Sequence, residues 1–479
     1  MHDRRYEKIF ECDLSEEKFK ELSLADVQHD ETQITTIYFG ARSKKWEEIQ
    51  SLSALKSGIR VRYYGQKPKG EVFIVDESSC ILEFKTHKDK TRANTKIRIG
   101  REEKVNFGEI LEYLTCLQKD QAKKDKFKKF SKITEILERL IEDFEITEIM
   151  PIGAANFKRL HFVFDDYRAT IDFDIKYYAA CEKDLDVIML QRGSGKKTIV
   201  ELKSNEDTDE VKRKEQEFLE ELKCEAKQVT RTKAKSLKEI LSENQVEFIE
   251  PELIEKSKYD WEITEREIKL DAEKNPKEFI NSCLKELRKD GIVAGEPETN
   301  VNYQYAYNVG ESGIIYMAKN LEGKNAVIKY KTYISHDEKN GTLVRYEYVE
   351  PFSEENFKKA MKFVGGNVDK DIKKSPFFCR DRLRCNMIMP KTKNVFELYA
   401  DHSYFVNGDG ADFYQVEIEY AGIVANEEDL KTENAKLVQT IDDDFAVLTD
   451  LVPKYFVKAG CGLRYSTRTK YDWVKKECF

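Results

Sequence analysis

Several short segments of the chain carry charged residues at every second position. In Ile59–Tyr64, for example, Arg60 and Arg62 alternate with apolar residues. Because successive side chains of a β-strand point to opposite faces, each such strand has one charged face. Burial of unpaired charges costs several kcal/mol per ion. The sequence therefore predicts a closed β-barrel with a charged lumen, in which opposite charges, metal ions or a polyanionic ligand meet these side chains.

The composition limits the classes of protein that remain. A length of 479 residues predicts two or three domains. Lys and Arg total 82 against 90 Asp and Glu, and the net charge of -8 argues against a broad nucleic-acid-binding surface. The ten Cys residues form no CxxC pair, which predicts reduced thiols and no structural zinc site. No apolar run approaches the roughly 20 residues that span a bilayer. We therefore expect a cytoplasmic protein that reaches a membrane only through an anchored partner.

The order of elements recurs along the chain. A polar, charge-rich stretch at 242–259 separates two similar successions of strands and helices, and we expect amphipathic helices over 105–117 and 131–145 in the first of them. The triplet Arg231-Thr232-Lys233 near the end of the first half returns as Arg468-Thr469-Lys470 in the second. We predict a divergent tandem repeat with domains at 1–245 and 255–479.

The charged strand positions of the first half are mostly basic. The cations are Arg60, Arg62, Lys85, Arg159, Arg168 and Lys203. Guanidinium groups bind phosphate oxygens through a planar fork, and lysines bind them as point charges. Several such groups on converging strands would hold a chain of phosphoryl groups. Glu201, together with Glu7, would supply the hard oxygen ligands that Mg²⁺ or Mn²⁺ prefers.

These segments resemble the triphosphate tunnel metalloenzyme (CYTH-like) superfamily, and the first half is most similar to the VTC polyphosphate polymerase domain. The matching segments are Thr36–Phe39, Gly58–Gly65, Leu82–Lys85, Phe157–Arg159, Arg168–Asp172 and Val200–Lys203. The resemblance implies an α+β fold of two tandem antiparallel eight-stranded β-tunnels with flanking helices. It also implies that the lumen cations bind triphosphate or polyphosphate, that Glu201 holds a metal ion, and that Lys233 lies near the tunnel mouth.

One position departs from the family pattern. The first strand of the family carries Glu-x-Lys, whereas this chain has Glu7-Lys8-Ile9. A regular strand therefore places Ile9 on the inward face and Lys8 outside. This departure puts full activity of the first tunnel in question.

The second half carries the opening signature ExExK of the CYTH-like proteins as Glu265, Glu267 and Lys269. A late pair, Glu417 and Glu419, completes a predicted cluster of four metal-binding carboxylates. The predicted substrate-binding cations of this half are Lys269, Lys329, Lys331, Arg345, Arg382 and Lys470. The paired arginines of the first half are missing, since Tyr316–Ala318 stands in their place, and weaker phosphate binding follows.

We therefore expect an enzyme that transfers phosphoryl groups of triphosphate or polyphosphate with Mg²⁺ or Mn²⁺. Polyphosphate synthesis from a nucleoside triphosphate is the preferred reading, with the first half dominating catalysis. One alternative is a triphosphatase acting on inorganic triphosphate, thiamine triphosphate or RNA 5′ ends, and only in the last case would a nucleic acid be a partner. The other alternative is a non-catalytic polyphosphate-binding protein with two impaired tunnels.

Overall fold

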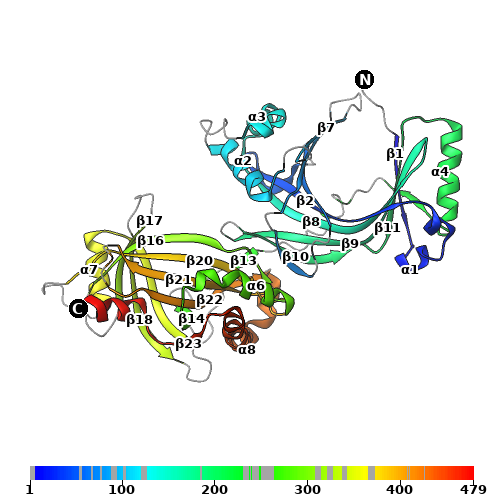
Figure 1. Cartoon of the computed structure of the whole chain (residues 1–479). Coiled ribbons are helices and arrows are strands. Elements are labelled where there is room, and N and C mark those ends of the chain that lie inside the picture. The colour runs from blue at the N-terminus through cyan, green and yellow to red at the C-terminus, as the bar shows by residue number, and fades with distance from the viewer. Residues whose placement is uncertain are drawn as a thin grey trace. The chain divides into compact units, whose positions relative to one another are not determined.

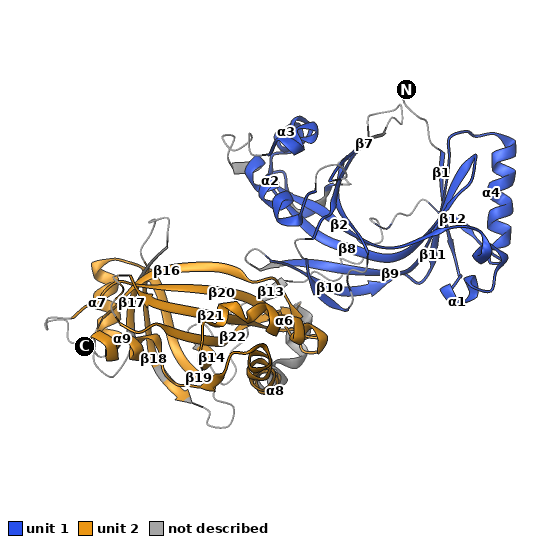
Figure 2. Ribbon diagram, viewed as in Figure 1, with its two compact units in different colours: residues 1–247 blue, residues 248–479 orange. Residues whose placement is uncertain are grey.

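The structure, a computed structural model, divides into two compact units, residues 1–247 and 248–479 (Figure 2). It describes residues 6–52, 57–65, 68, 70–75, 78–87, 94–100, 104–119, 127–183, 186–229, 233, 237, 239, 247–249, 264–307, 314–320, 327–336, 342–364, 373–406, 408, 410–425 and 427–478. Most of the predicted connection at 242–259 lies outside these residues.

The first unit is built on one antiparallel sheet (Figure 1). Its strands are β1 (Tyr6–Cys12), β2 (Asp30–Ser43), β3 (Trp46–Ser51), β4 (Ser57–Tyr64), β5 (Val72–Ile74), β6 (Ile81–His87), β7 (Asn94–Ile99), β8 (Ile146–Val163), β9 (Tyr167–Lys183), β10 (Asp186–Ser194), β11 (Thr198–Ser204) and β12 (Lys227–Val229). Its main path runs β12-β1-β11-β9-β8-β2-β4-β6-β7. Within the described residues the sheet is open between β7 and β1.

The second unit contains a closed ring of strands. Its strands are β13 (Glu247–Ile249), β14 (Thr264–Ala272), β15 (Val293–Ala294), β16 (Glu298–Tyr307), β17 (Ile314–Asn320), β18 (Val327–His336), β19 (Leu343–Pro351), β20 (Phe378–Ile388), β21 (Asn394–Phe405), β22 (Phe413–Ala425) and β23 (Leu463–Tyr465). The path β22-β21-β20-β16-β17-β18-β19-β14 returns to its start because β14 also pairs with β22. This ring is an eight-stranded barrel.

The two sheets repeat one topology. Without the accessory strands β3, β5, β10, β12, β13, β15 and β23, the order is β1-β11-β9-β8-β2-β4-β6-β7 in the first unit and β14-β22-β21-β20-β16-β17-β18-β19 in the second. The strands correspond one to one, and β1 is therefore the equivalent of β14. The prediction of a tandem α+β fold built from antiparallel tunnels is confirmed, with closure seen in the second unit.

Helices cover the outer faces of both sheets. In the first unit they are α1 (Glu16–Phe19), α2 (Phe107–Lys119), α3 (Ser131–Phe144) and α4 (Asp209–Glu221). The predicted helices at 105–117 and 131–145 correspond to α2 and α3. Their apolar residues pack with Phe39 of β2 and Val61 of β4 in one buried core. Because the alternate residues of these strands face that core, Tyr38 and Arg62 face the lumen.

The second unit has α6 (Ile280–Lys289), α7 (Glu354–Phe363), α8 (Glu427–Ala459) and α9 (Lys470–Cys478). Helices α6 and α8 pack on the outer face of β14 and β22 around Phe445 and Ile418. Helix α9 instead places Trp473 and Val474 among Phe378, Phe405 and Phe413. None of the described helices is both long and apolar enough to cross a membrane.

Candidate functional site

The arginines of β4 gather around one buried carboxylate in the first unit. Arg60 Nε lies 2.6 Å from Glu83 Oε2, Arg98 Nε lies 2.7 Å from Oε1, and Arg62 Nη1 lies 3.5 Å from Oε2. Glu83 is fully buried. Burial and the neighbouring Arg60 guanidinium lower the pKa of Arg62. One carboxylate thus faces three guanidinium groups, which leaves a positive charge that a bound anion would neutralise.

A second group of cations surrounds Asp172 on β9. Arg159 of β8 donates two hydrogen bonds to its carboxylate, at 2.6 and 2.7 Å, and Lys233 donates a further one. Lys85 and Arg168 make no ion pair with any residue that the structure describes. Among the described residues, the cations clustered here are Arg60, Arg62, Lys85, Arg98, Arg159, Arg168, Lys203 and Lys233, and the carboxylates that contact or directly oppose them are Glu7, Glu83, Asp172 and Glu201. Within this described cluster the cations outnumber the carboxylates.

The two predicted metal ligands of the first unit contact each other. A hydrogen bond with Glu201, followed by burial, raises the pKa of Glu7 to about 7. Burial opposes ionisation of Glu201, but the hydrogen bond from Glu7 and the charge of Lys203, whose Nζ lies 2.8 Å from Glu201 Oε1, lower the pKa of Glu201. Two adjacent carboxyl groups that share a proton fit a hard divalent cation, which would replace that proton.

The register of β1 is regular at the position that departs from the family pattern. Glu7 lies opposite Lys203 and Ile9 opposite Glu201 on β11. Ile9 packs against the apolar cluster of inward-facing residues that includes Phe157. On the other face, Lys8 Nζ lies 2.6 Å from Glu215 of α4. The inward face of the first strand therefore carries Glu7, Ile9 and Glu11, and no lysine.

Metal affinity of the first unit should depend on pH through Glu7. Its pKa of about 7 means that a proton competes with the cation below neutral pH. Displacing one such proton should tighten Mn²⁺ binding about tenfold between pH 6 and pH 8. Titration calorimetry with Mn²⁺ at both values measures this, and the matched variant Glu7→Gln should lose the pH dependence. An equal pH dependence in Glu7→Gln would assign the proton to another group.

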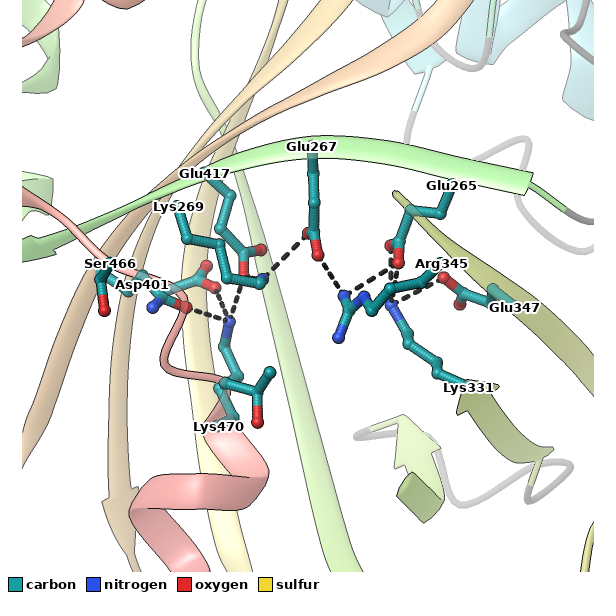
Figure 3. A network of polar contacts seen from close by, with 12 residues as sticks. Glu265, Glu267, Lys269, Lys331, Arg345, Glu347, Asp401, Glu417, Ser466 and Lys470 are labelled. Atoms are coloured by element: carbon teal, nitrogen blue, oxygen red, sulfur yellow. Dashed lines mark hydrogen bonds and ion pairs between the residues drawn. The ribbon is translucent and has the colours of Figure 1, made fainter. Parts of the chain in front are cut away.

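The lumen of the second unit is neutralised by its own side chains (Figure 3). Lys470 of α9 lies 2.8 Å from Asp401 and 2.7 Å from Glu417, and Arg382 contacts both carboxylates at 2.6 Å. Glu267 accepts hydrogen bonds from Lys269 and from Arg345 and so links this group to the next.

In the remaining part of this network, each cation is also paired with a carboxylate. Lys331 Nζ lies 2.7 Å from both Glu265 and Glu347, Arg345 lies 2.9 Å from Glu265, and Lys329 pairs with Glu347. All six predicted substrate-binding cations of the second unit are therefore already paired with carboxylates.

The predicted carboxylate cluster of the second unit separates into two parts. Oxygens of Glu265, Glu267 and Glu419 lie within 4.8 Å of one another and could hold a cation. Burial and the charge of Glu265 raise the pKa of Glu419, which has no ion pair in the described part of the chain. Glu417 lies among Lys269, Arg382 and Lys470 instead, so its oxygens are engaged by cations.

The strand registers show how the two lumens differ. Aligning the pairs Arg159–Asp172 and Arg382–Asp401 places Glu201 with Glu417 and Lys85 with Lys331. At other equivalent positions the basic side chains of the first unit are replaced. Arg60 corresponds to Tyr316, Arg62 to Ala318, Arg168 to Glu397 and Lys203 to Glu419. The central ion pair is retained, whereas the charges of Arg60, Arg62, Arg168 and Lys203 are lost or reversed.

Replacing equivalent lysines by alanine should lower the stability of the protein much more in the second unit than in the first. Lys331 is about one-tenth exposed and bridges two carboxylates, so Lys331→Ala should destabilise the protein by about 3–5 kcal/mol. Lys85 has no such pair, and Lys85→Ala should change stability by less than about 1 kcal/mol. Urea unfolding of the full chain measures both. Equal losses of stability would contradict the assignment of Lys331 to an internal ion network.

Sequence reasoning missed some residues of these lumens. On β21, Tyr399 donates a hydrogen bond to Glu397, and both lie on the face that carries Asp401. The alternation of Glu397, Tyr399 and Asp401 in the sequence was a usable signal. Thr36 and Tyr38 on β2 belong to the segment Thr36–Phe39 that resembles the family pattern, but they carry no charge, so alternation of charge does not identify them.

Comparisons with known proteins place the chain in a family. A sequence model of the VTC domain matches residues 5–263, which is more than half of the chain. The chain therefore belongs to the VTC domain family. No curated protein sequence matches it significantly.

Several solved structures match part of the chain at low sequence identity. The PH1819 protein of Pyrococcus horikoshii OT3 is 13% identical, with a TM-score of 0.26 over 49% of this chain and 99% of that one. The S. pombe Pct1 RNA triphosphatase is 11% identical, with a TM-score of 0.22 over 41% and 83%. The RNA triphosphatase domain of the mimivirus mRNA capping enzyme is 9% identical, with a TM-score of 0.25 over 41% and 90%.

Proposed function

We propose that the first unit binds the phosphate chain of triphosphate or polyphosphate in its lumen and transfers a phosphoryl group. The observation that carries this proposal is the excess of lumen cations, above all Arg60, Arg62 and Arg98 around the single carboxylate of Glu83. Partly buried cations that crowd around one carboxylate repel one another, and a bound anion relieves that repulsion. Phosphate chains are acceptor-only anions that suit guanidinium forks.

Different lumen residues would bind the phosphate chain and the metal ion during the transfer. Arg60 and Arg62 would hold non-bridging oxygens and fix the chain, and Arg159, oriented by Asp172, would hold a further phosphoryl group. Glu7 and Glu201 would hold Mg²⁺ or Mn²⁺, which supplies neutralisation of the charge that develops on the phosphoryl oxygens. This arrangement positions and stabilises reactants, and it needs no covalent intermediate.

The proposed reaction is extension of polyphosphate from a nucleoside triphosphate. The bond between the β- and γ-phosphoryl groups breaks, the nucleoside diphosphate leaves, and an oxygen of the acceptor chain forms the new phosphoanhydride bond. Family membership supports this acceptor. Transfer to water instead of to a phosphate chain would make the protein a triphosphatase with the same residues in the same roles.

A specific observation favours a second candidate, a polyphosphate-binding protein without catalysis. Ile9 occupies the inward position where the resemblance calls for lysine, and the other lumen faces retain their cations. Binding and transfer can therefore be separated in this chain. Under this candidate the second unit, with its paired charges, contributes packing or regulation.

Incubation of the full chain with ATP and Mn²⁺, followed by separation of the products on a gel, tests the proposal. The expected result is long-chain polyphosphate together with ADP. Free phosphate without polyphosphate would identify a triphosphatase. Unchanged ATP would contradict phosphoryl transfer, and binding of polyphosphate in the same preparation would then support the second candidate.

A further inference from the structure

Two buried threonine hydroxyls in the first lumen lack hydrogen-bond partners within the part of the chain that the structure describes. Thr36 is fully buried, lies opposite Arg62 on β4 and shares its inward face. Thr170 is buried opposite Glu201 on β11. Neither hydroxyl oxygen has a hydrogen-bond partner among the described residues, and the same holds for Nε of Arg62. Buried polar atoms are nearly always hydrogen-bonded in native proteins, so these atoms require a ligand or ordered water.

Tyr38 belongs to the same inward face of β2. It lies two residues beyond Thr36 and opposite Arg60. Its ring packs against the apolar cluster that contains Phe157. Burial raises the pKa of its hydroxyl, while the charges of Arg60, Arg62 and Arg159 act in the opposite direction, so the hydroxyl lies among these cations. Tyr38 is partly buried, and its hydroxyl makes no hydrogen bond with a residue that the structure describes, so it is available to a ligand in the lumen.

The second unit lacks this set of hydroxyls. By register, Thr36 corresponds to Gln304 and Tyr38 to Ala306. Ala306 packs in the apolar cluster that contains Trp473 of α9. Thr170 corresponds to Tyr399, whose hydroxyl is already bonded to Glu397. The hydroxyls of Thr36, Tyr38 and Thr170 thus accompany the arginine pair in the first unit, and the equivalent positions of the second unit offer no free hydroxyl.

We propose that Thr36, Tyr38 and Thr170 form a neutral hydroxyl subsite that donates hydrogen bonds to non-bridging oxygens of the bound phosphate chain. Charged groups attract any anion, whereas hydroxyl donors at fixed positions select oxygens by direction. The subsite rests on the proposed function of the first lumen and adds its positioning residues. It runs along the lumen from the arginines of β4 to Glu201.

Calorimetry of inorganic triphosphate with the full chain tests the subsite. Thr36→Val removes the hydroxyl and keeps the branched shape, whereas Thr36→Ser keeps the hydroxyl. We expect affinity about tenfold weaker for Thr36→Val, unchanged affinity for Thr36→Ser, and about tenfold weaker affinity for Tyr38→Phe. Because the Thr36 hydroxyl has no protein partner, Thr36→Val should not lower the melting temperature.

The outcomes separate this proposal from the function on which it rests. Normal triphosphate affinity in both Thr36→Val and Tyr38→Phe would show that ordered water satisfies these hydroxyls and would overturn the subsite, while binding by the wild-type protein would still support the first lumen. Absence of triphosphate binding by the wild-type protein would overturn both. A loss of affinity in Thr36→Ser equal to that in Thr36→Val would assign the effect to packing and would also contradict the subsite.

Discussion

Replacing both arginines of β4 should nearly abolish binding of triphosphate. In Arg60→Ala/Arg62→Ala the loss of charge-assisted hydrogen bonds, each about 1.5–3 kcal/mol, should weaken affinity by a factor of about 10² to 10⁴. The fold should survive because Arg98 remains 2.7 Å from Glu83 and still neutralises that buried carboxylate. Isothermal titration calorimetry with inorganic triphosphate measures the affinity.

A control double variant removes the same charge outside the lumen. Arg139 of α3 and Arg213 of α4 are exposed on helices that cover the outer face of the same unit. Arg139→Ala/Arg213→Ala should bind triphosphate within about twofold of the wild type, since exposed charges contribute little and distant charges are screened. If both double variants lost affinity equally, net charge rather than the lumen would explain binding.

Removing one carboxylate charge at the predicted metal site should stop catalysis. Glu201→Gln keeps the shape and hydrogen-bonding capacity of the side chain beside Glu7 and Lys203 but removes an anionic ligand. Because a bound cation stabilises the transition state by several kcal/mol, turnover should fall by a factor of at least about 100. Formation of polyphosphate or phosphate from ATP at limiting Mn²⁺ measures this.

The matched control lies in the carboxylate cluster of the second unit. Glu419 has no ion pair among the described residues, so Glu419→Gln leaves no buried cation uncompensated. Turnover in Glu419→Gln should match that of the wild type. Loss of turnover in Glu419→Gln with normal turnover in Glu201→Gln would move the catalytic metal to the second unit.

The class of fold follows from the alternation of charge in the strands. Segments such as Ile59–Tyr64 and Tyr414–Tyr420 carry their charges on one strand face, which suits either solvent or a polar lumen, and the closed ring of the second unit places Glu417 in a lumen. The repeated topology was also visible as a repeated order of elements. Closure itself depends on long-range pairing, such as that between β14 and β22, which local sequence does not encode.

The division of charges within each lumen could not be predicted from the strands one at a time. Glu417 and Glu419 look alike in sequence, but Glu417 is surrounded by Lys269, Arg382 and Lys470, and Glu419 lies with Glu265 and Glu267. Which cation pairs with which carboxylate is set by register and by contacts across the barrel. The residue pattern within one strand determines neither the register nor these contacts.

The number of triphosphate sites per chain tests the central claim most directly. The first lumen has unmatched cations, whereas those of the second are paired with carboxylates, so calorimetry of the full chain with inorganic triphosphate should give one site per chain. That site should disappear in Arg60→Ala/Arg62→Ala and persist in Lys331→Ala. Two equivalent sites, or a single site that survives loss of both arginines, would contradict the assignment of phosphate binding to the first unit.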